Sequence, residues 1–341
     1  MNKKSIKITS PSNIALVKYW GKYGNQYPCN PSISFTLNHC KTEMEVDITP
    51  KKADKVSIEV YFEGKKHEKF VPKIATFFDK IKDEYAVVSE YDWEIKSTNT
   101  FPHSSGIASS ASSMSAVAAA LVAFQHSDMD LQEISRLARI GSGSACRSVF
   151  PKIAWWGKEK MMPLSSHEHA IPCWEEMDEV FLDFKDTILI ASSGEKSVSS
   201  TAGHGLMNNH FFAERRYAQA HQNALEIYHA MRSGDLERFG EIVEEEALTL
   251  HALMMMSSPS FILLKPATLA MIEKIRLFRA ESKLPVYFTL DAGPNIHLLY
   301  PNSIAKEIEL FIDQELKPLC ENQFLIKDEV GQGLEIISKS F

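Results

Sequence analysis

The sequence predicts an α+β protein with two lobes, and three observations support this fold class. The chain has 341 residues, more than the about 250–300 residues at which a single hydrophobic core usually stops growing. Strand patterns dominate the first hundred residues, whereas helical and strand patterns alternate toward the end. We expect the boundary near residue 185, with an N-terminal lobe spanning residues 1–185 and a C-terminal lobe spanning residues 186–341.

The first hundred residues alternate apolar and polar side chains over short stretches. This period of two is typical of half-buried strands. It predicts strands at residues 33–37, 42–48 and 55–61, then a helix over 72–83 and a strand over 93–97.

The next segment changes from strand to helix. The turn-forming residues at 101–106 predict a loop, and the alanine-rich stretch that follows predicts a helix ending near residue 124. Asp130 is placed to cap another helix, and Gly141 to end it.

The last third of the chain alternates helices and strands. A strand at residues 187–191 precedes a long helical stretch to Met256, which Gly234 and Asp235 divide into two helices, with Asp235 as the N-cap. Downstream we expect a helix (266–281), two strands (286–290 and 296–300), a helix (303–314), and short strands near Phe324 and Ile336.

The composition narrows the class of protein. A formal net charge of −7 argues against a nucleic-acid-binding protein, which normally has a basic face. Five scattered cysteines without a CxxC pair are typical of free thiols in a reducing compartment. No signal peptide or membrane span is expected, because the longest apolar run is far shorter than the about 20 residues that a span needs. We therefore expect a soluble cytoplasmic protein.

The loop from Pro102 to Ala111 is the most informative segment. It contains a glycine and several serines and leads directly into a helix N-terminus, whose N–H groups and dipole favour an anion. It predicts a phosphate cradle, although no Walker A pattern occurs in the chain. The alternative is a small-residue helix packed closely against a sheet.

Two further loops repeat this chemistry. Residues 139–147 place two glycines, two serines and an arginine together, and Arg147 has the forked donors that suit phosphate or carboxylate. Residues 196–203 again combine serine, threonine and glycine after a strand. The alternative for the first loop is a plain helix–helix turn with Arg147 in solvent. Three such loops suit a polyphosphate and an acid bound side by side.

Charged partners come from two other segments. Lys18 and Lys22 lie four residues apart beside Tyr19 and Trp20, and Asp291 ends a strand next to a Gly-Pro turn. As structure alone, the lysines could extend to solvent from a strand, and Asp291 could form an Asx-turn.

Taken together, these segments resemble one family. Residues 12–22, 99–111, 141–147 (GSGSACR), 198–201 and 291–295 match, in order, the signature blocks of mevalonate diphosphate decarboxylases, which belong to the GHMP kinase superfamily. The resemblance implies an N-terminal lobe like domain 2 of ribosomal protein S5 and a ferredoxin-like C-terminal lobe. It also implies ATP-dependent conversion of mevalonate 5-diphosphate to isopentenyl diphosphate, with release of ADP, phosphate and CO₂.

The resemblance also implies roles for individual residues. Asp291 would act on the tertiary hydroxyl of the substrate, Lys18 would orient that chemistry, and Arg147 would grip the carboxylate. The implied substrate-binding residues are Asn13, Tyr19, Lys22, Ser142, Ser144 and Ser200. The implied ATP-binding residues are Pro102, Ser104, Ser105, Gly106, Ala108, Ser109, Ser110 and Lys196. Mg²⁺ would enter with ATP, with Ser109 as its candidate protein contact.

Several positions depart from the family's usual pattern. The departures are Tyr23-Gly24, His103, Pro151-Lys152 and Ala202-Gly203-His204, and two of them lie near the expected diphosphate site. They leave open a decarboxylase that acts on the monophosphate, a kinase of the 3-hydroxyl, or a binding protein without turnover. A cationic His204 could replace a missing diphosphate contact, or it could be an incidental loop residue. A homodimer is common in the family and is expected here.

Overall fold

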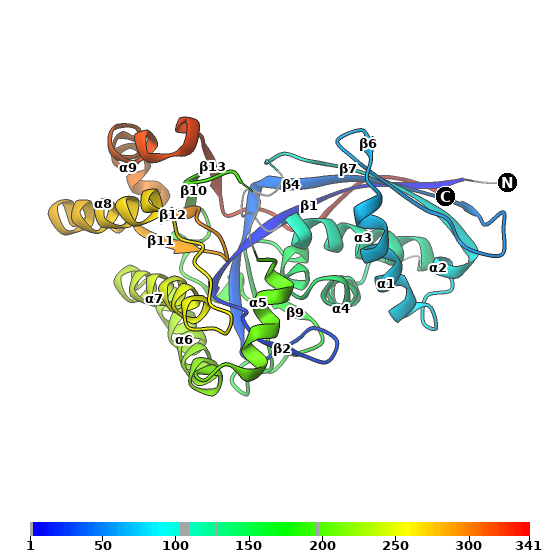
Figure 1. Cartoon of the computed structure of the whole chain (residues 1–341), viewed down its shortest axis with the longest axis horizontal. Coiled ribbons are helices and arrows are strands. Elements are labelled where there is room, and N and C mark those ends of the chain that lie inside the picture. The colour runs from blue at the N-terminus through cyan, green and yellow to red at the C-terminus, as the bar shows by residue number, and fades with distance from the viewer. Residues whose placement is uncertain (1–2, 103–108, 127, 195–197) are drawn as a thin grey trace.

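The computed structural model describes residues 3–102, 109–126, 128–194 and 198–341. It shows two lobes side by side, each built on its own mixed or antiparallel sheet and covered by helices (Figure 1). The predicted two-lobed α+β fold is therefore confirmed.

The first sheet contains the long N-terminal strands. Its strand order is β14-β1-β4-β7-β5-β6, and β8 and β9 extend it from β4. The strands are β1 (Lys4–Val17), β4 (Ser32–Pro50), β5 (Ile58–Phe62), β6 (Lys65–Lys66), β7 (Tyr91–Asn99), β8 (Ile153–Trp156), β9 (Ala170–Pro172) and β14 (Glu335–Ser340).

Residues 33–37 and 42–48 belong to the single strand β4, so the prediction of two strands is wrong here. The sequence Asn38-His-Cys-Lys breaks the alternation, but one carboxylate bridges the break. Asp328 accepts hydrogen bonds from the backbone N–H groups of Asn38, His39 and Cys40 at 2.9, 2.8 and 2.7 Å. A partner 288 residues away therefore keeps the strand continuous.

Helices α1 (Val71–Ile81), α2 (Val87–Glu90), α3 (Ser109–Gln125) and α4 (Leu131–Gly141) cover one face of this sheet (Figure 1). The small residues of α3 let it approach the strands closely: Ser112 is 2.7 Å from Thr42 Oγ1 and Ser115 is 2.5 Å from Ser10 Oγ. The expected cap is confirmed, since Asp130 accepts from the Gln132 N–H at 2.8 Å. The expected end of α4 at Gly141 is also confirmed.

The second sheet has the order β11-β12-β10-β13. Its strands are β10 (Lys185–Leu189), β11 (Tyr287–Leu290), β12 (Ile296–Tyr300) and β13 (Leu325–Glu329). The helices of this half are α5 (Ser200–Leu206), α6 (Ala213–Ser233), α7 (Leu236–Met255), α8 (Pro266–Ser282) and α9 (Ala305–Phe311), which continues as a π-helix to Leu316. As predicted, Gly234 and Asp235 divide the helical stretch and Asp235 caps α7; Gly234 does so in a left-handed conformation (φ 73°).

The last strand, β14, lies in the first sheet rather than the second, antiparallel to β1. The C-terminal half of the chain therefore contributes one strand to the first sheet, which helps to join the two halves. The division at residue 185 stays a prediction.

No helix within the described ranges has both the length and the apolar character that crossing a bilayer requires.

Candidate active site

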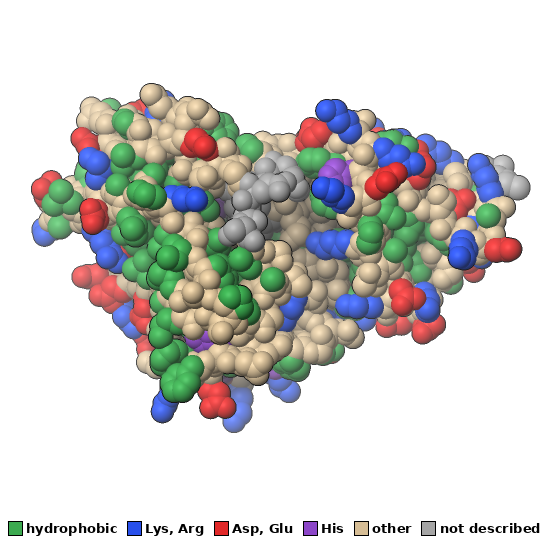
Figure 2. Space-filling model, viewed as in Figure 1, with side chains coloured by type: hydrophobic (Ala, Val, Ile, Leu, Met, Phe, Trp, Pro, Cys, Tyr) green, Lys and Arg blue, Asp and Glu red, His purple; other side chains and the backbone are tan. Residues whose placement is uncertain are grey.

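A cavity of about 810 Å³ lies between the two lobes. Figure 2 shows the corresponding hollow, with Lys and Arg side chains along one side of it. Eleven of the residues proposed from the sequence line this cavity, and they come from segments throughout the chain: Asn13, Lys18, Tyr19, Lys22, Ser109, Ser110, Ser142, Ser144, Arg147, Ser200 and Asp291. Residues far apart in the chain therefore converge on one cavity.

Lys18 and Asp291 face each other across the two lobes. Lys18 follows the end of β1, and its ammonium donates to Asp291 Oδ1 at 3.3 Å and to the Ala15 carbonyl at 2.6 Å. The lysine side chain is 2% exposed and the aspartate 25%. Burial lowers the pKa of Lys18, and the charge of Asp291 opposes that effect. Lys18 therefore does not extend to solvent, and the carboxylate is oriented by a buried cation.

Arg147 is also buried, so the alternative that placed it in solvent is wrong. Its Nη1 and Nε donate to the hydroxyls of Ser32 and Ser34 at 2.7 and 3.1 Å. Its Nη2 donates to Asn13 Oδ1 at 3.3 Å. Within the described residues the guanidinium has no carboxylate partner at ion-pair distance. A buried cation without an anion is costly, so the cavity is built to receive an anion beside Arg147.

The loop before Arg147 is positioned through Asn13 and Tyr19. The Asn13 amide donates to the Ser144 carbonyl at 3.1 Å and to the Ser148 hydroxyl at 2.8 Å. Tyr19 packs over Gly143, where an added Cβ would lie 2.6 Å from the tyrosine hydroxyl oxygen. Glycine is therefore required at this point for the loop to approach Tyr19.

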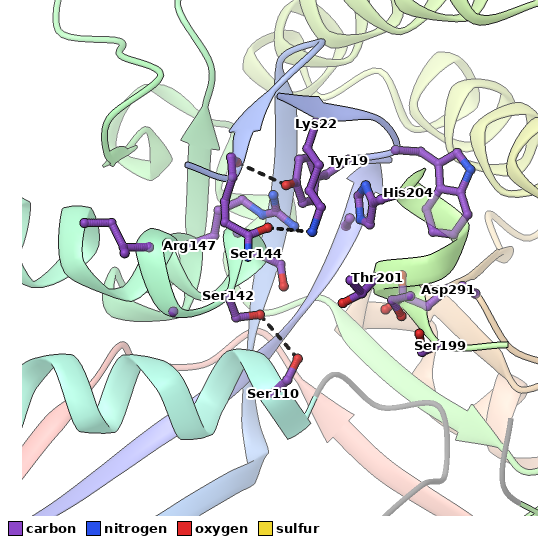
Figure 3. A pocket seen from close by; sticks show the side chains of 18 of the residues that line it. Tyr19, Lys22, Ser110, Ser142, Ser144, Arg147, Ser199, Thr201, His204 and Asp291 are labelled. Carbon is purple, nitrogen blue, oxygen red and sulfur yellow. Dashed lines mark hydrogen bonds between the residues drawn. The ribbon is translucent and has the colours of Figure 1, made fainter. Parts of the chain in front are cut away.

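The outer part of the cavity is formed by the hairpin of β2 (Lys22–Tyr23) and β3 (Tyr27–Pro28). Lys22 donates to Gln26 Oε1 at 2.7 Å, which holds the ammonium over the cavity. Figure 3 shows Lys22, Tyr19 and Arg147 on the side where Ser142 and Ser144 lie, with Asp291, Ser199 and Thr201 opposite. The two sides of the cavity thus carry different charges: the cations Lys22 and Arg147 on one and the carboxylate of Asp291 on the other, with hydroxyls on both.

Ser109 and Ser110 lie at the start of α3 and line two cavities. Ser110 Oγ is 3.4 Å from Ser142 Oγ, which links this helix to the loop before Arg147 (Figure 3). A neighbouring cavity of about 80 Å³ has mostly apolar walls, including Val60, Ile74 and Met114. A helix N-terminus between a polar and an apolar cavity suits a phosphate group attached to a flat apolar base.

The comparisons with known proteins agree with this geometry. The family model described as the diphosphomevalonate decarboxylase-like N-terminal domain matches residues 10–168. The mevalonate 5-diphosphate decarboxylase C-terminal domain matches residues 187–337. The solved mevalonate diphosphate decarboxylase from Staphylococcus aureus is 31% identical, covers 99% of each chain and has a TM-score of 0.86. The chain belongs to the mevalonate diphosphate decarboxylase family.

Two other relatives extend this result. A curated diphosphomevalonate decarboxylase from Schizosaccharomyces pombe is 29% identical over 324 residues, which is 89% of this chain and 81% of the relative. A structure of MDDEF in complex with MVAPP, AMPPCP and magnesium is 29% identical, with a TM-score of 0.85 over 99% of this chain and 100% of the other.

Not every residue expected from this family can be placed. His103, Ser104, Ser105, Gly106, Ala108 and Lys196 lie outside the described residues. Pro102 is described and exposed, and it is not one of the residues that line the main cavity.

The hypothesis that His204 is a cation that contacts the diphosphate is wrong. The side chain is 7% exposed, and its Nδ1 accepts a hydrogen bond from the Gly21 N–H at 3.1 Å, which requires that nitrogen to be unprotonated. Burial, aided by the charges of Lys22 and Arg147, lowers the pKa of His204 to about 3. The neutral imidazole packs against the rings of Tyr19 and Trp20 in tilted arrangements, with centroid distances of 4.4 and 4.8 Å, and holds the Gly21 turn.

Sequence reasoning missed one face of the cavity. Lys73, Thr76, Phe77 and Lys80 of α1 line it, as does Gln26 of the hairpin. Burial and then the charge of Lys80 lower the pKa of Lys22, so these lysines act on one another. Thr76, Phe77 and Lys80 lie three, four and seven positions after Lys73, so these four residues of α1 share one face of the helix. The sequence does not indicate that this face borders a ligand rather than solvent.

Proposed function

We propose that this protein catalyses the ATP-dependent decarboxylation of mevalonate 5-diphosphate to isopentenyl diphosphate, releasing ADP, phosphate and CO₂. One observation carries the proposal: Lys18 and Arg147, both 2% exposed, share a cavity with the carboxylate of Asp291. That arrangement suits a substrate with an anionic group at each end and a hydroxyl between them.

Different cations of the cavity would bind the two anionic ends of the substrate. Arg147 would bind the substrate carboxylate, since its remaining N–H groups can form the forked pair that a carboxylate accepts. The diphosphate would lie toward Lys22, Tyr19 and the hydroxyls of Ser142 and Ser144, which occupy the outer part of the same side. This placement leaves the 3-hydroxyl near Asp291.

The start of α3 supports binding of ATP with Mg²⁺. Ser109 and Ser110 present hydroxyls at a helix N-terminus beside an apolar cavity for the base. Mg²⁺ prefers oxygen ligands and usually binds through phosphates and one or two protein groups, which the Ser109 hydroxyl fits. When bound, the metal neutralises charge on the transferring phosphoryl group.

Asp291 would accept the proton of the 3-hydroxyl as that oxygen bonds to the γ-phosphorus and ADP departs. Lys18 orients the carboxylate, because its ammonium is 3.3 Å from Oδ1. The C3–O bond then breaks and phosphate leaves. The electron pair of the bond to the carboxylate forms the new double bond, and CO₂ is released. Arg147 holds that carboxylate in place until the bond breaks.

The test is product counting with three substrates. CO₂, ADP and phosphate are measured after adding ATP, Mg²⁺ and either mevalonate, its 5-phosphate or its 5-diphosphate. We expect equal amounts of all three products from the 5-diphosphate alone. ADP without CO₂ would identify a 3-kinase, CO₂ from the 5-phosphate would identify a monophosphate decarboxylase, and no ADP from any substrate would identify a binding protein.

We also propose a cytoplasmic homodimer. Five free cysteines, four of them buried, fit a reducing compartment. Exposed apolar side chains around α5, α7 and the loop between α5 and α6, such as Phe211 at 91% and Met256 at 56%, fit a surface covered by a second subunit. Light scattering after size-exclusion chromatography should give twice the chain mass of 38.5 kDa, and a monomer mass would reject the dimer.

A further inference from the structure

The backbone of Lys18 is held by the C-terminal lobe. β1 ends at Val17, so the Lys18 N–H lies beyond the ladder that would otherwise bind it. It donates instead to Glu246 Oε2 of α7 at 2.8 Å. The Lys18 carbonyl accepts from the Asn30 amide at 3.1 Å and from Arg216 Nη2 at 3.5 Å. Each backbone polar group of Lys18 therefore has a side-chain partner.

Glu246 is the centre of this cluster. Its side chain is 0% exposed, and it forms an ion pair with Arg216 of α6, which is 1% exposed. The two N–O distances are 2.7 and 2.5 Å, and the Asn223 amide donates to the same carboxylate at 2.8 Å. Burying such a pair costs desolvation that packing alone would avoid. A buried pair that also contacts Asn223 and the backbone of Lys18 is better suited to fixing one geometry than to adding stability.

The same helix also reaches Asp291. His251 lies five residues after Glu246 in α7, about 7.5 Å farther along the helix axis. Its Nε2 is 3.1 Å from the Asp291 carbonyl oxygen. That carbonyl also accepts from the Gly293 N–H at 2.7 Å in the turn after β11. One rigid helix therefore contacts the backbone of both Lys18 and Asp291.

We propose that α7 is the positioning element of the reaction centre, with Glu246 and His251 as positioning residues that set the approach of Lys18 to Asp291. Neither residue touches the substrate in this scheme. Lys18 comes from the first sheet and Asp291 from the second, so their spacing depends on how the lobes meet. Helix α7 bonds to the backbone of both residues and thereby fixes their positions relative to each other. The inference rests on the proposed function only for its kinetic readout.

Glu246 has a second effect, through charge. The charged groups that face Lys18 are Asp291, Glu246, Arg147 and Arg216. Burial lowers the Lys18 pKa most strongly, whereas Asp291 and Glu246 raise it and Arg147 lowers it. Removing the charge of Glu246 therefore lowers the Lys18 pKa further, so that the ammonium loses its proton at a lower pH. A purely structural role for Glu246 would not produce that shift.

The first experiment compares Glu246→Gln with Glu244→Gln. Glu244 is a matched control, because it is a buried carboxylate on the same helix that pairs with Arg279 at 2.5 Å, whereas Glu246 bonds to Lys18. We expect E246Q to lower kcat by about 10–100-fold, the scale of a misplacement near 1 Å. KM for ATP and for the 5-diphosphate should change less than about threefold, and the alkaline limb of the kcat profile should move to lower pH. E244Q should match the wild type in all three.

The second experiment uses His251, in case E246Q fails to fold. His251→Leu removes the donor to the Asp291 carbonyl, whereas His251→Gln keeps an N–H near the position of Nε2. His210→Leu is the control, because it removes an equivalent bond, from Nε2 to the Leu253 carbonyl at 3.0 Å, that does not reach Asp291. We expect kcat to fall in H251L, to recover substantially in H251Q and to be retained in H210L.

Crystal structures of these variants separate this inference from the proposed function, since they need no turnover. In H251L the distance from Lys18 Nζ to Asp291 Oδ1 should exceed the 3.3 Å of the parent, and in H210L it should not. An unchanged distance in H251L, or equal kcat losses in H251L and H210L, would overturn the positioning role. A wild type that releases no CO₂ would reject the decarboxylase and leave the structural comparison valid.

Discussion

The Lys18 ammonium lies 3.3 Å from Asp291 Oδ1, although 273 positions separate the two residues in the chain. This contact joins the end of β1 in the first sheet to the turn after β11 in the second.

Replacing Asp291 by Asn should abolish turnover while leaving ATP binding intact. The amide is isosteric but cannot accept the hydroxyl proton, so we expect kcat to fall by about 10²–10⁴-fold, the usual contribution of a general acid–base group. Calorimetric titration with an ATP analogue checks that the nucleotide site survives. Asp183→Asn is the control, because Asp183 is exposed and bonded to Asn302 at 2.9 Å. Near-normal turnover of D291N would remove Asp291 from the mechanism.

Replacing Arg147 by Lys should weaken binding of the substrate carboxylate. Lysine keeps the charge but loses the fork and the bonds to Ser32 and Ser34. We expect KM for the 5-diphosphate to rise about 10- to 100-fold, equivalent to about 1.4–2.8 kcal/mol. Arg136→Lys, a change at a surface ion pair with Glu133, should leave KM unchanged. An analogue without the carboxylate should bind R147K and wild type equally, and a selective loss of that analogue would contradict the assignment.

Replacing Gly143 by Ala should disturb Tyr19. The new methyl carbon would lie 2.6 Å from the tyrosine hydroxyl oxygen, so the ring or the loop must move. We expect a higher KM for the 5-diphosphate and an unchanged KM for ATP, measured by initial rates. Gly205→Ala has no heavy atom within 4 Å of its added carbon and should keep normal kinetics. If both variants bind substrate equally well, Tyr19 does not shape the site.

Acid should destabilise the protein through His204. Its pKa is lowered to about 3 in the folded state, whereas an unfolded histidine has a pKa of about 6.5. Between those values the unfolded state binds more protons, so stability falls as the pH falls through this window. From pH 7 to pH 5 the His204 contribution to the free energy of unfolding should decrease by about 2 kcal/mol.

Thermal melts of wild type and His204→Asn at both pH values measure this contribution. Asparagine keeps an acceptor for the Gly21 N–H but does not titrate. The loss of stability on acidification should therefore be smaller in H204N than in wild type. His39→Asn is the control, since His39 is 60% exposed, and it should show the wild-type loss. An equal pH dependence in H204N would mean that His204 is not buried as a neutral ring.

The principal site residues were predicted through their resemblance to the signature blocks of the family, each of which is a short contiguous stretch of the chain. The GSGSACR block carries the glycine that Tyr19 requires and the arginine that enters the cavity. The caps at Asp130 and Asp235 are likewise bonds to residues two or three positions away. Features that depend on short spacing could be predicted without a structure.

Features that depend on distant partners could not. Nothing near Asn38 indicates that Asp328 will bind three of the backbone N–H groups of β4. The lysines of α1 have the pattern of an ordinary solvent-facing helix side, although Lys73 and Lys80 border the cavity. In the sequence, Glu246 is one of several acidic residues of α7. Only its contacts with Lys18 and Arg216 in the structure distinguish it from the others.

The pairing of β14 with β1 has a consequence for how the protein is made. Residues 335–340 supply the neighbour for Ser5 to Thr9, so that edge of the first sheet stays open on the ribosome until residues 335–340 have emerged. An open edge of this kind can pair with another chain. The lobe that supplies Lys18 and Arg147 is therefore completed only after residues 335–340 are made, and expressing residues 1–185 alone should yield material prone to association.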